Sequence, residues 1–490
     1  MDIVSISFDK KNIKNKVFLA GLPILFSSNE IDQADKDLLR YSPNKIEINK
    51  LLIYQNNIDQ IDKIENLPIN MGAILIKNDS DQVKLIFKEI HTESLMSVVP
   101  TTGKLNEKDV IFEGFFKELM FKLPKFNNEY NDKVLESLIL EGRFEQLGIE
   151  KPDSQTRFSG LNGSFILDSS DLYFEFFSEN ASIFTTEKFP YSDLGVLAVD
   201  GKLGIKTPKI KQFLEGKKLK VPINIFKLNL SNSDLKIESK GLLNLDSFSS
   251  QSIEIQGEVV FKNPKKIPYY LPKKIGKKTR NWLERGIVSA DSVVGSFFYE
   301  GPLRSFSGSS DTENTKLEAN FFVQNLDLVF SSRWPRIEGI NTVITFQNSN
   351  FKIINATGFL NETKLSSING EISNIFSKLP KLLLNGNITG SLDSFIEVSN
   401  NSPLEKWLWG VTKTASGEGN TSLNLTLNLD LKKIKNSSFN GNLFFENTEI
   451  SFAENFLPLK EARGKITFTN KLISKIYPLI CVLIISIASS

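Results

Sequence analysis

The chain has 490 residues, and 59 Lys and Arg against 57 Asp and Glu give a net charge of +2, which offers no electrostatic argument for a nucleic-acid partner. Hydrophobic residues make up 40% of the sequence, which excludes wholesale disorder. One His and one Cys exclude an intramolecular disulfide and a Cys/His zinc cluster built by the chain alone. At roughly 150 residues per domain, the length predicts about three domains or one continuous repetitive body.

The N-terminal part, 1–128, is expected to be a mixed α/β segment. Its opening residues, 1–16, hold an apolar stretch too short for a signal-peptide core. Segment 107–123 has apolar residues every four positions and is followed by Pro124, a pattern that predicts a helix; these residues are Ile111, Phe115, Leu119 and Leu123. A second helix is predicted over 129–140.

Most of the remaining chain alternates apolar and polar residues with a period of two, which is typical of strands with one apolar face. We expect β segments over 129–262 and 304–471. Segment 223–230 continues the alternation after a slip of one residue. Three further strands supply candidate residues for an apolar binding groove: Leu423, Leu425, Leu427, Leu429, Leu431, Ile253, Ile255, Val259, Phe439, Leu443 and Phe445.

A helix-containing connector is expected over 263–303. Its predicted helix has one shared face, formed by Ile275, Thr279, Trp282, Leu283 and Ile287. The stretch 262–280 holds eight Lys or Arg residues and no acidic residue. Three interpretations remain open for it: a solvated helix face, a surface for lipid headgroups, or a nucleic-acid contact.

Two features lie toward the C-terminus. Ser402 begins a predicted short helix, with Pro403 at the first helical position and Glu405 three residues after the cap. The tail 472–490 is apolar and uncharged, with Pro478 inside it. It is either a membrane helix at the short end of the usual length, a buried terminal strand, or a segment foreign to the fold.

An internal repeat joins 322–348 to 444–470 at a gapless offset. Its identical pairs include Phe322/Phe444, Asn325/Asn447, Phe330/Phe452, Phe346/Phe468 and Asn348/Asn470. A repeated unit of strand, aromatic corner and strand predicts a sheet that grows by addition of similar units.

Catalytic motifs are absent from the sequence. It contains no phosphate-binding loop, no HExxH and no GxSxG, and no metal or cofactor site is expected. His91 has no companion motif, so a surface or packing role is favoured over general-base catalysis. Asp168 with Asp171, or Glu175 with Glu179, are formal acid/base pairs, but solvated strands carry such residues by default. We therefore expect a protein that is not an enzyme.

Several short motifs follow one another along the chain, beginning in the connector: Tyr270-Leu271-Pro272, Trp282-Leu283, Gly286, Gly301-Pro302-Leu303, Trp334-Pro335 and Ser402-Pro403-Leu404. In this order they resemble the YhdP branch of the AsmA-like family. The resemblance covers roughly 130–470. It departs where family members have Phe-Pro-Phe and this chain has Arg304-Ser305-Phe306-Ser307.

The resemblance implies an envelope protein attached to the inner membrane, with its body in the periplasm, that supports phospholipid transport toward the outer membrane and outer-membrane biogenesis. It also implies an N-terminal membrane helix and a longer chain, so the sequence is interpreted as a fragment. The implied partners are phospholipid, the inner membrane and the outer membrane, without nucleic acid. Protein partners are not indicated.

The expected fold is all-β with a few short helices: a long, curved antiparallel sheet forming an extended hydrophobic groove built from repeated units. An independent physical argument supports lipid cargo, because exposing an acyl chain of about 16 carbons to water costs on the order of 12 kcal/mol. The alternative is a structural or adhesive β-sandwich whose apolar faces pair with each other and carry no lipid.

Overall fold

The structure of the protein is a computed structural model with two compact units. The first comprises 1–232 and 238–254, and the second 233–237 and 255–490. The structure describes residues 4–9, 17–19, 22–24, 45–48, 51–56, 69–70, 74–78, 82–93, 111–124, 139–152, 155–168, 171–185, 189, 191, 193–206, 220–246, 251–273, 275–303, 315–407, 410–433, 436–451 and 457–469.

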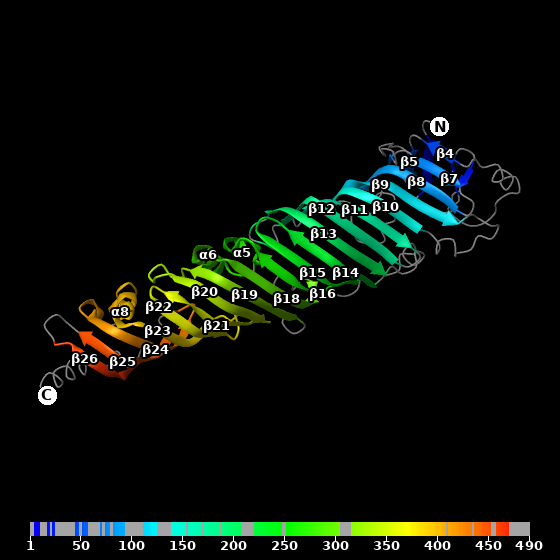
Figure 1. Ribbon diagram of the computed structural model, residues 1–490. Helices are drawn as coiled ribbons and strands as arrows, with labels where there is room; N and C mark the ends of the chain where they lie inside the picture. Colours follow the sequence, from blue (N-terminus) through cyan, green and yellow to red (C-terminus); the bar gives the residue numbers. More distant parts are fainter. Residues whose placement is uncertain are drawn as a thin grey trace. The chain divides into compact units, whose positions relative to one another are not determined.

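Strands dominate both units (Figure 1). Up to residue 261 they are β1 (Val4–Asp9), β2 (Val17–Leu19), β3 (Leu22–Ile24), β4 (Lys45–Ile48), β5 (Leu51–Asn56), β6 (Ile69–Asn70), β7 (Ile74–Asn78), β8 (Gln82–His91), β9 (Ile111–Pro124), β10 (Ile139–Lys151), β11 (Thr156–Asp168), β12 (Asp171–Thr185), β13 (Asp193–Lys206), β14 (Lys220–Ser231), β15 (Leu235–Asp246) and β16 (Ser252–Phe261).

The rest of the chain adds strands and short helices. The strands are β17 (Ile287–Ser289), β18 (Ser292–Pro302), β19 (Lys316–Leu328), β20 (Ile337–Gln347), β21 (Asn350–Leu360), β22 (Thr363–Ile372), β23 (Lys381–Ser391), β24 (Ser416–Asp430), β25 (Ser438–Ser451) and β26 (Leu459–Thr469). The helices are η2 (Pro264–Lys266), α5 (Ile267–Tyr270), α6 (Lys277–Gly286), α8 (Leu392–Asn400), α9 (Leu404–Trp407) and η3 (Val411–Lys413).

Antiparallel pairing between chain neighbours builds the main sheet, and the sheet is not closed. In the first unit β8 to β14 pair in sequence order, each with the next. In the second unit β18 to β26 do the same. The expectation of an all-β protein with few short helices and an antiparallel sheet is therefore confirmed.

The helix predicted over 107–123 is wrong, because β9 occupies this part of the chain from Ile111 onward. Gly114 and Glu118 have positive φ, and the register between β9 and β10 shifts twice. Each such β-bulge adds one residue to one strand and displaces the apolar alternation. A strand with bulges therefore imitates the spacing of four that was interpreted as helical. The helix predicted over 129–140 falls mostly outside the described residues, and β10 begins at its end.

Residues with positive φ, in the left-handed region, lie at the β-bulges of many strands. Asn325, Asn355 and Ser367 have φ of 51°, 50° and 51°, and each lies at a register shift between neighbouring strands. Gln146 on β10 occupies the same kind of position in the first unit. A bulge whose first residue is left-handed bends its strand and increases its twist.

An asparagine on the next strand holds several of these bulges, an arrangement we name the bulge clasp. The backbone N–H of Asn325 donates to Asn341 Oδ1 at 3.1 Å, and that of Asn355 donates to Asn369 Oδ1 at 2.9 Å. In the first unit Gln146 donates in the same way to Asn162 Oδ1 at 2.9 Å. The clasp satisfies a backbone donor that the bulge removes from the regular ladder.

The repeated sequence corresponds to repeated structure. Asn325 and Asn447, which align in the repeat, both adopt positive φ, at 51° and 52°. Both mark a register shift, on the pairs β19–β20 and β25–β26. The slip of one residue in segment 223–230 likewise appears as a register shift, between β13 and β14.

The predicted connector helix is α6, but its buried residues are Arg280 and Gly286. Trp282 is 40% exposed and donates through Nε1 to the carbonyl of Phe330, whereas Ile287, at the end of the helix, is buried. α9 follows the predicted cap, because Leu404 N donates to Ser402 Oγ at 3.3 Å. α8, which the sequence patterns missed, is capped by Ser391 Oγ accepting from Ser394 N.

Candidate functional site

The second unit presents a continuous apolar sheet face on β23 and β24. On β24 the side chains of Leu423, Leu425, Leu427 and Leu429 are half-buried. Their neighbours Asn424, Thr426 and Asn428 are exposed on the opposite face. Every residue of β23 alternates in the same way between half-buried and exposed. The predicted alternation of apolar and polar residues is therefore observed as alternating half-buried and exposed side chains. It gives the sheet one apolar and one polar side.

Strand register places these leucines beside further apolar residues. Leu427 lies opposite Leu384 on one side and Phe439 on the other. Leu423 lies between Ile388 and Leu443. Phe439 and Leu443 were predicted groove residues, whereas Leu382, Leu384 and Ile388 on β23 were not. Their signal was present, because that strand alternates as clearly as β24 does.

Glycines on this face make room for neighbouring side chains. A Cβ atom at Gly386 would lie 2.3 Å from Ile368 Cδ1, and one at Gly370 would lie 2.8 Å from Leu384 Cδ2. The methyl groups of Ile368 and Leu384 therefore extend over backbone that carries no side chain. Across β22 and β23 the face is a surface of aliphatic methyl groups with shallow relief.

No second sheet lies over this face among the described residues of the second unit. None of the described hydrophobic residues on β23, β24 and β25 is fully buried. α8 packs against one end of these strands, where its residues Leu392 and Val398 are buried. Leu392 packs so closely on Gly417 that a Cβ there would lie 2.3 Å from its Cδ2. The face is closed at this end and half-exposed along its leucines.

Between Lys381 and Glu418, at opposite ends of β23 and β24, the other side of the same strands is polar, with uncharged amides and hydroxyls. A hollow on it is lined by Ser367, Asn369, Asn385, Gly386, Asn387, Asn424, Leu425, Thr426, Asn440 and Asn442. Thr467 Oγ1 donates to Asn442 Oδ1 at 2.8 Å, and Asn369 Nδ2 donates to the carbonyl of Ser367. Such amide and hydroxyl side chains are well solvated on this side of the sheet.

The equivalent face of the first unit is filled. Its core is a cluster of buried residues on β8 to β13: Phe87, Ile90, Leu119, Phe144, Phe165, Phe176, Ala181, Leu197 and Val199. Phe144 is 2% exposed and Ile90 0%. Aromatic rings meet edge to face, with 5.7 Å between the centroids of Phe116 and Phe165.

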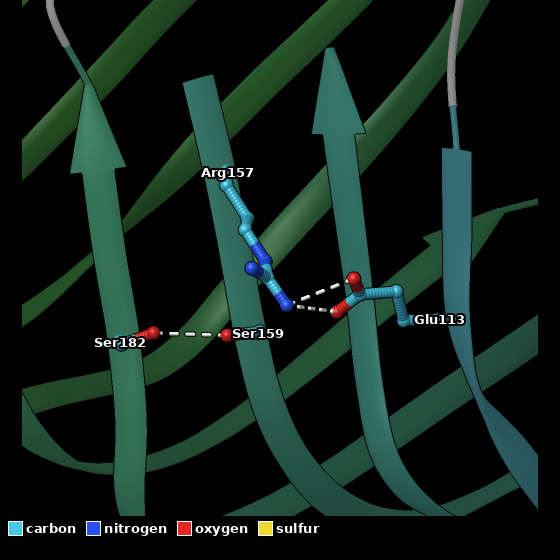
Figure 2. Close-up of polar contacts among 4 residues, drawn as sticks. All are labelled: Glu113, Arg157, Ser159 and Ser182. Atoms are coloured by element: carbon cyan, nitrogen blue, oxygen red, sulfur yellow. Dashed lines mark hydrogen bonds and ion pairs between the residues drawn. The ribbon is translucent and has the colours of Figure 1, made fainter. Parts of the chain in front are cut away.

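The outward side of the first unit carries charge pairs between strands. Figure 2 shows Arg157 of β11 reaching Glu113 of β9, with Nη2 to carboxylate distances of 2.8 and 2.9 Å. Beside it Ser159 and Ser182 share a hydroxyl hydrogen bond of 2.9 Å. Lys117 forms an ion pair with Glu89, and this contact lowers the pKa of the Glu89 carboxyl and raises the pKa of Lys117. Exposed pairs of this kind contribute little to stability individually.

The remaining predicted groove residues lie at different depths. Ile255 and Val259 of β16 are buried, and Ile253 is half-buried. Phe439, Leu443 and Phe445 of β25 are half-buried. Leu431 lies beyond the end of β24 and is 48% exposed, so the structure does not group it with the leucines of the sheet face.

Residues considered for catalysis do not converge. His91 is exposed on β8, with its ring 5.9 Å from that of Phe115. Glu175 forms an exposed ion pair with Lys202 at 2.5 Å. In the part of the chain that the structure describes, no group of acidic, His or Cys side chains has the arrangement of a metal site.

The sequence model of one family, described as "YhdP protein", matches residues 63–476. The chain belongs to the YhdP family. This is a family of AsmA-like cell-envelope proteins with a role in lipid transport rather than catalysis. No curated protein and no solved structure shows significant similarity to the chain.

Among the described residues, no helix is both long and apolar enough to cross a bilayer. The apolar tail 472–490, predicted as a possible membrane helix, lies outside the described residues.

Proposed function

We propose that this YhdP-family chain shields phospholipid acyl chains on the apolar face of its second unit while lipid passes through the cell envelope between inner and outer membranes. The observation that carries the proposal is the row of half-buried leucines on β23 and β24 that no second sheet covers among the described residues. The body of the protein would lie in the periplasm, associated with the inner membrane.

The energetics favour such a face over passage through water. Each methylene removed from water contributes about 0.8 kcal/mol, so a chain of about 16 carbons gains on the order of 12 kcal/mol. The polar outward side, with Asn424 and Thr426 exposed, keeps the protein itself in water. Transfer by shielding requires no nucleophile, acid, base or cofactor from the protein.

The test is the lipid content of the purified full chain, measured by mass spectrometry. Wild-type protein is expected to carry phospholipid, and the double variant Leu425→Asp/Leu427→Asp is expected to lose it. The fold should survive, because both side chains are only half-buried. Thr426→Asp is the matched control: it adds a charge to the same strand on the exposed face and should leave lipid content unchanged.

A second candidate is a structural β protein without cargo, favoured by the filled face of the first unit, where Ile90 and Phe144 are almost inaccessible. Lipid-free wild-type protein, together with unfolding of the double variant, would support this candidate. Those results would mean that the leucines form an ordinary core and that the transport proposal is wrong.

A further inference from the structure

Two neighbouring turns of the second unit form a surface that we name the lysine rim, comprising residues 373–381 and 430–433. The first turn joins β22 to β23, and the second follows β24. Lys381 lies opposite Asp430 in the ladder, and Leu431 N donates to the carbonyl of Pro380 at 3.1 Å. The two turns are therefore one contiguous surface at one end of the strands.

The lysine rim combines positive charge with exposed apolar side chains. Phe376, Leu379 and Leu431 are 47%, 53% and 48% exposed. Lys378, Lys381, Lys432 and Lys433 are exposed beside them. Large apolar side chains on a turn are costly in water, and lysines next to them are typical of surfaces that enter the headgroup region of a bilayer.

The charge of the rim is not balanced by its own carboxylates. Asp430 is the acidic residue within it, and its Oδ1 accepts the backbone N–H groups of Lys432 at 3.0 Å and Lys433 at 2.8 Å. Glu371 nearby lies 4.0 Å from Lys352. At the other end of the same strands, the exposed charges are mainly acidic. The acidic residues are Glu362, Asp393, Glu397 and Glu418; Lys364 is exposed beside them, and Glu405 is paired to Lys413.

Hydrogen bonds hold the turns in place before any partner arrives. Ile375 N donates to the carbonyl of Ser349, and Phe376 N donates to Asn374 Oδ1, both at 2.9 Å. Leu379 N donates to Ser377 Oγ at 3.2 Å. A surface that is already ordered loses less conformational entropy on binding.

We propose that the lysine rim docks the second unit on an anionic phospholipid bilayer, with Phe376, Leu379 and Leu431 entering the headgroup region and the lysines contacting lipid phosphates. The charge complementarity and the exposed apolar side chains select this partner. The inference goes beyond shielding of acyl chains, because it concerns how the protein meets a membrane surface rather than what lies on its leucine face.

The test is co-sedimentation of the full chain with vesicles of phosphatidylcholine alone or mixed with phosphatidylglycerol. Binding is expected only to the anionic vesicles and should weaken as salt rises. A lysine near an anionic surface contributes about fivefold to binding, so the triple variant Lys378→Gln/Lys432→Gln/Lys433→Gln should bind on the order of 100-fold more weakly. Phe376→Ser/Leu379→Ser should also reduce binding while keeping its dependence on anionic lipid.

The matched control is Lys273→Gln/Lys277→Gln/Lys278→Gln, which removes the same charge from the exposed basic connector around α6. Equal loss in the control, or undiminished binding of both rim variants, would overturn the proposal. Circular dichroism should show all variants folded. The lipid content of the variants should match that of the wild type. If the wild-type protein carries lipid but does not bind vesicles, the docking proposal is wrong and the shielding proposal still stands.

Discussion

The apolar face on β8 to β13 of the first unit and the one on β23 to β25 of the second unit follow the same alternation but are filled differently. In the first unit large rings cover backbone that lacks side chains: a Cβ at Gly201 would lie 2.4 Å from Phe176 Cζ, and one at Gly163 would lie 2.6 Å from Phe144 Cζ. On β23 to β25 of the second unit, leucines and isoleucines predominate and remain half-buried. Alternation thus identifies the apolar face of a strand, whereas side-chain volume decides how much of that face remains accessible.

The outward faces differ in a parallel way. Ion pairs such as Arg157 with Glu113 link strands of the first unit, whereas uncharged amides and hydroxyls line the hollow on β22 to β25. These two groups of strands, β8 to β13 and β22 to β25, therefore combine one kind of sheet with two kinds of packing. Truncating side chains on each face, and comparing the loss of stability, distinguishes a face that is buried for structure from one that stays accessible.

The largest expected effect is loss of a buried ring. Phe144→Ala should destabilise the first unit by about 3–5 kcal/mol, because Phe144 is 2% exposed and its removal leaves a cavity. The matched change Leu427→Ala should cost less than about 2 kcal/mol, since the side chain is only half-buried. Hydrogen exchange read separately for each unit measures both, because two units need not unfold together. Equal costs would contradict the distinction between the faces.

A bulge clasp should give a smaller, local effect common to both units. Asn369→Ala leaves the exposed N–H of Asn355 without its protein partner and should cost about 0.5–1.5 kcal/mol. Asn162→Ala should act likewise on Gln146 in the first unit. Exchange of the amides of Asn355 and Gln146 reports the change, and the exposed Asn387→Ala is the control. Unaltered protection at both bulges would show that the asparagines do not hold them.

Sequence patterns predicted the sheet where alternation was uninterrupted and failed where bulges interrupted it. The leucines of β24 have no bulge between Leu423 and Leu429, and their face was predicted correctly. β9 was mistaken for a helix because Gly114 and Glu118 displace its alternation. The filling of the first unit depends on contacts between strands, such as Phe144 over Gly163, which no single strand's pattern contains.

The helices show the same limit. α9 was predictable from Ser402 and Pro403, because a cap is a local signal. α8 has an equally local cap, Ser391 accepting from Ser394 N, so it was predictable in the same way although it was not predicted. The inward face of α6 could not be inferred from spacing, since the buried Arg280 is fixed by donating to the carbonyl of Pro272 at 2.9 Å.

The smallest expected effect is a pH response confined to the second unit. The backbone N–H of Lys433, followed by that of Lys432, lowers the pKa of the Asp430 carboxyl. A lowered folded pKa means that the stabilisation is present above the unfolded value of about 3.9 and is lost as pH falls through the folded value. Amide exchange at Lys433, corrected for intrinsic rate, should therefore accelerate in acid. Asp430→Asn should abolish this step, and a persistent step would assign it to another group.

The bulge clasp also affects which insertions and deletions such a protein can accept during evolution. Each clasp links a strand only to its immediate neighbour, as Asn341 does for Asn325 and Asn369 for Asn355. Duplication or deletion of an entire hairpin leaves the surviving neighbours with compatible partners. Insertion of one residue within a strand instead turns every side chain beyond it to the wrong side and separates the asparagine from its bulge. Homologous chains should accordingly differ by multiples of two strands far more readily than by single residues within them.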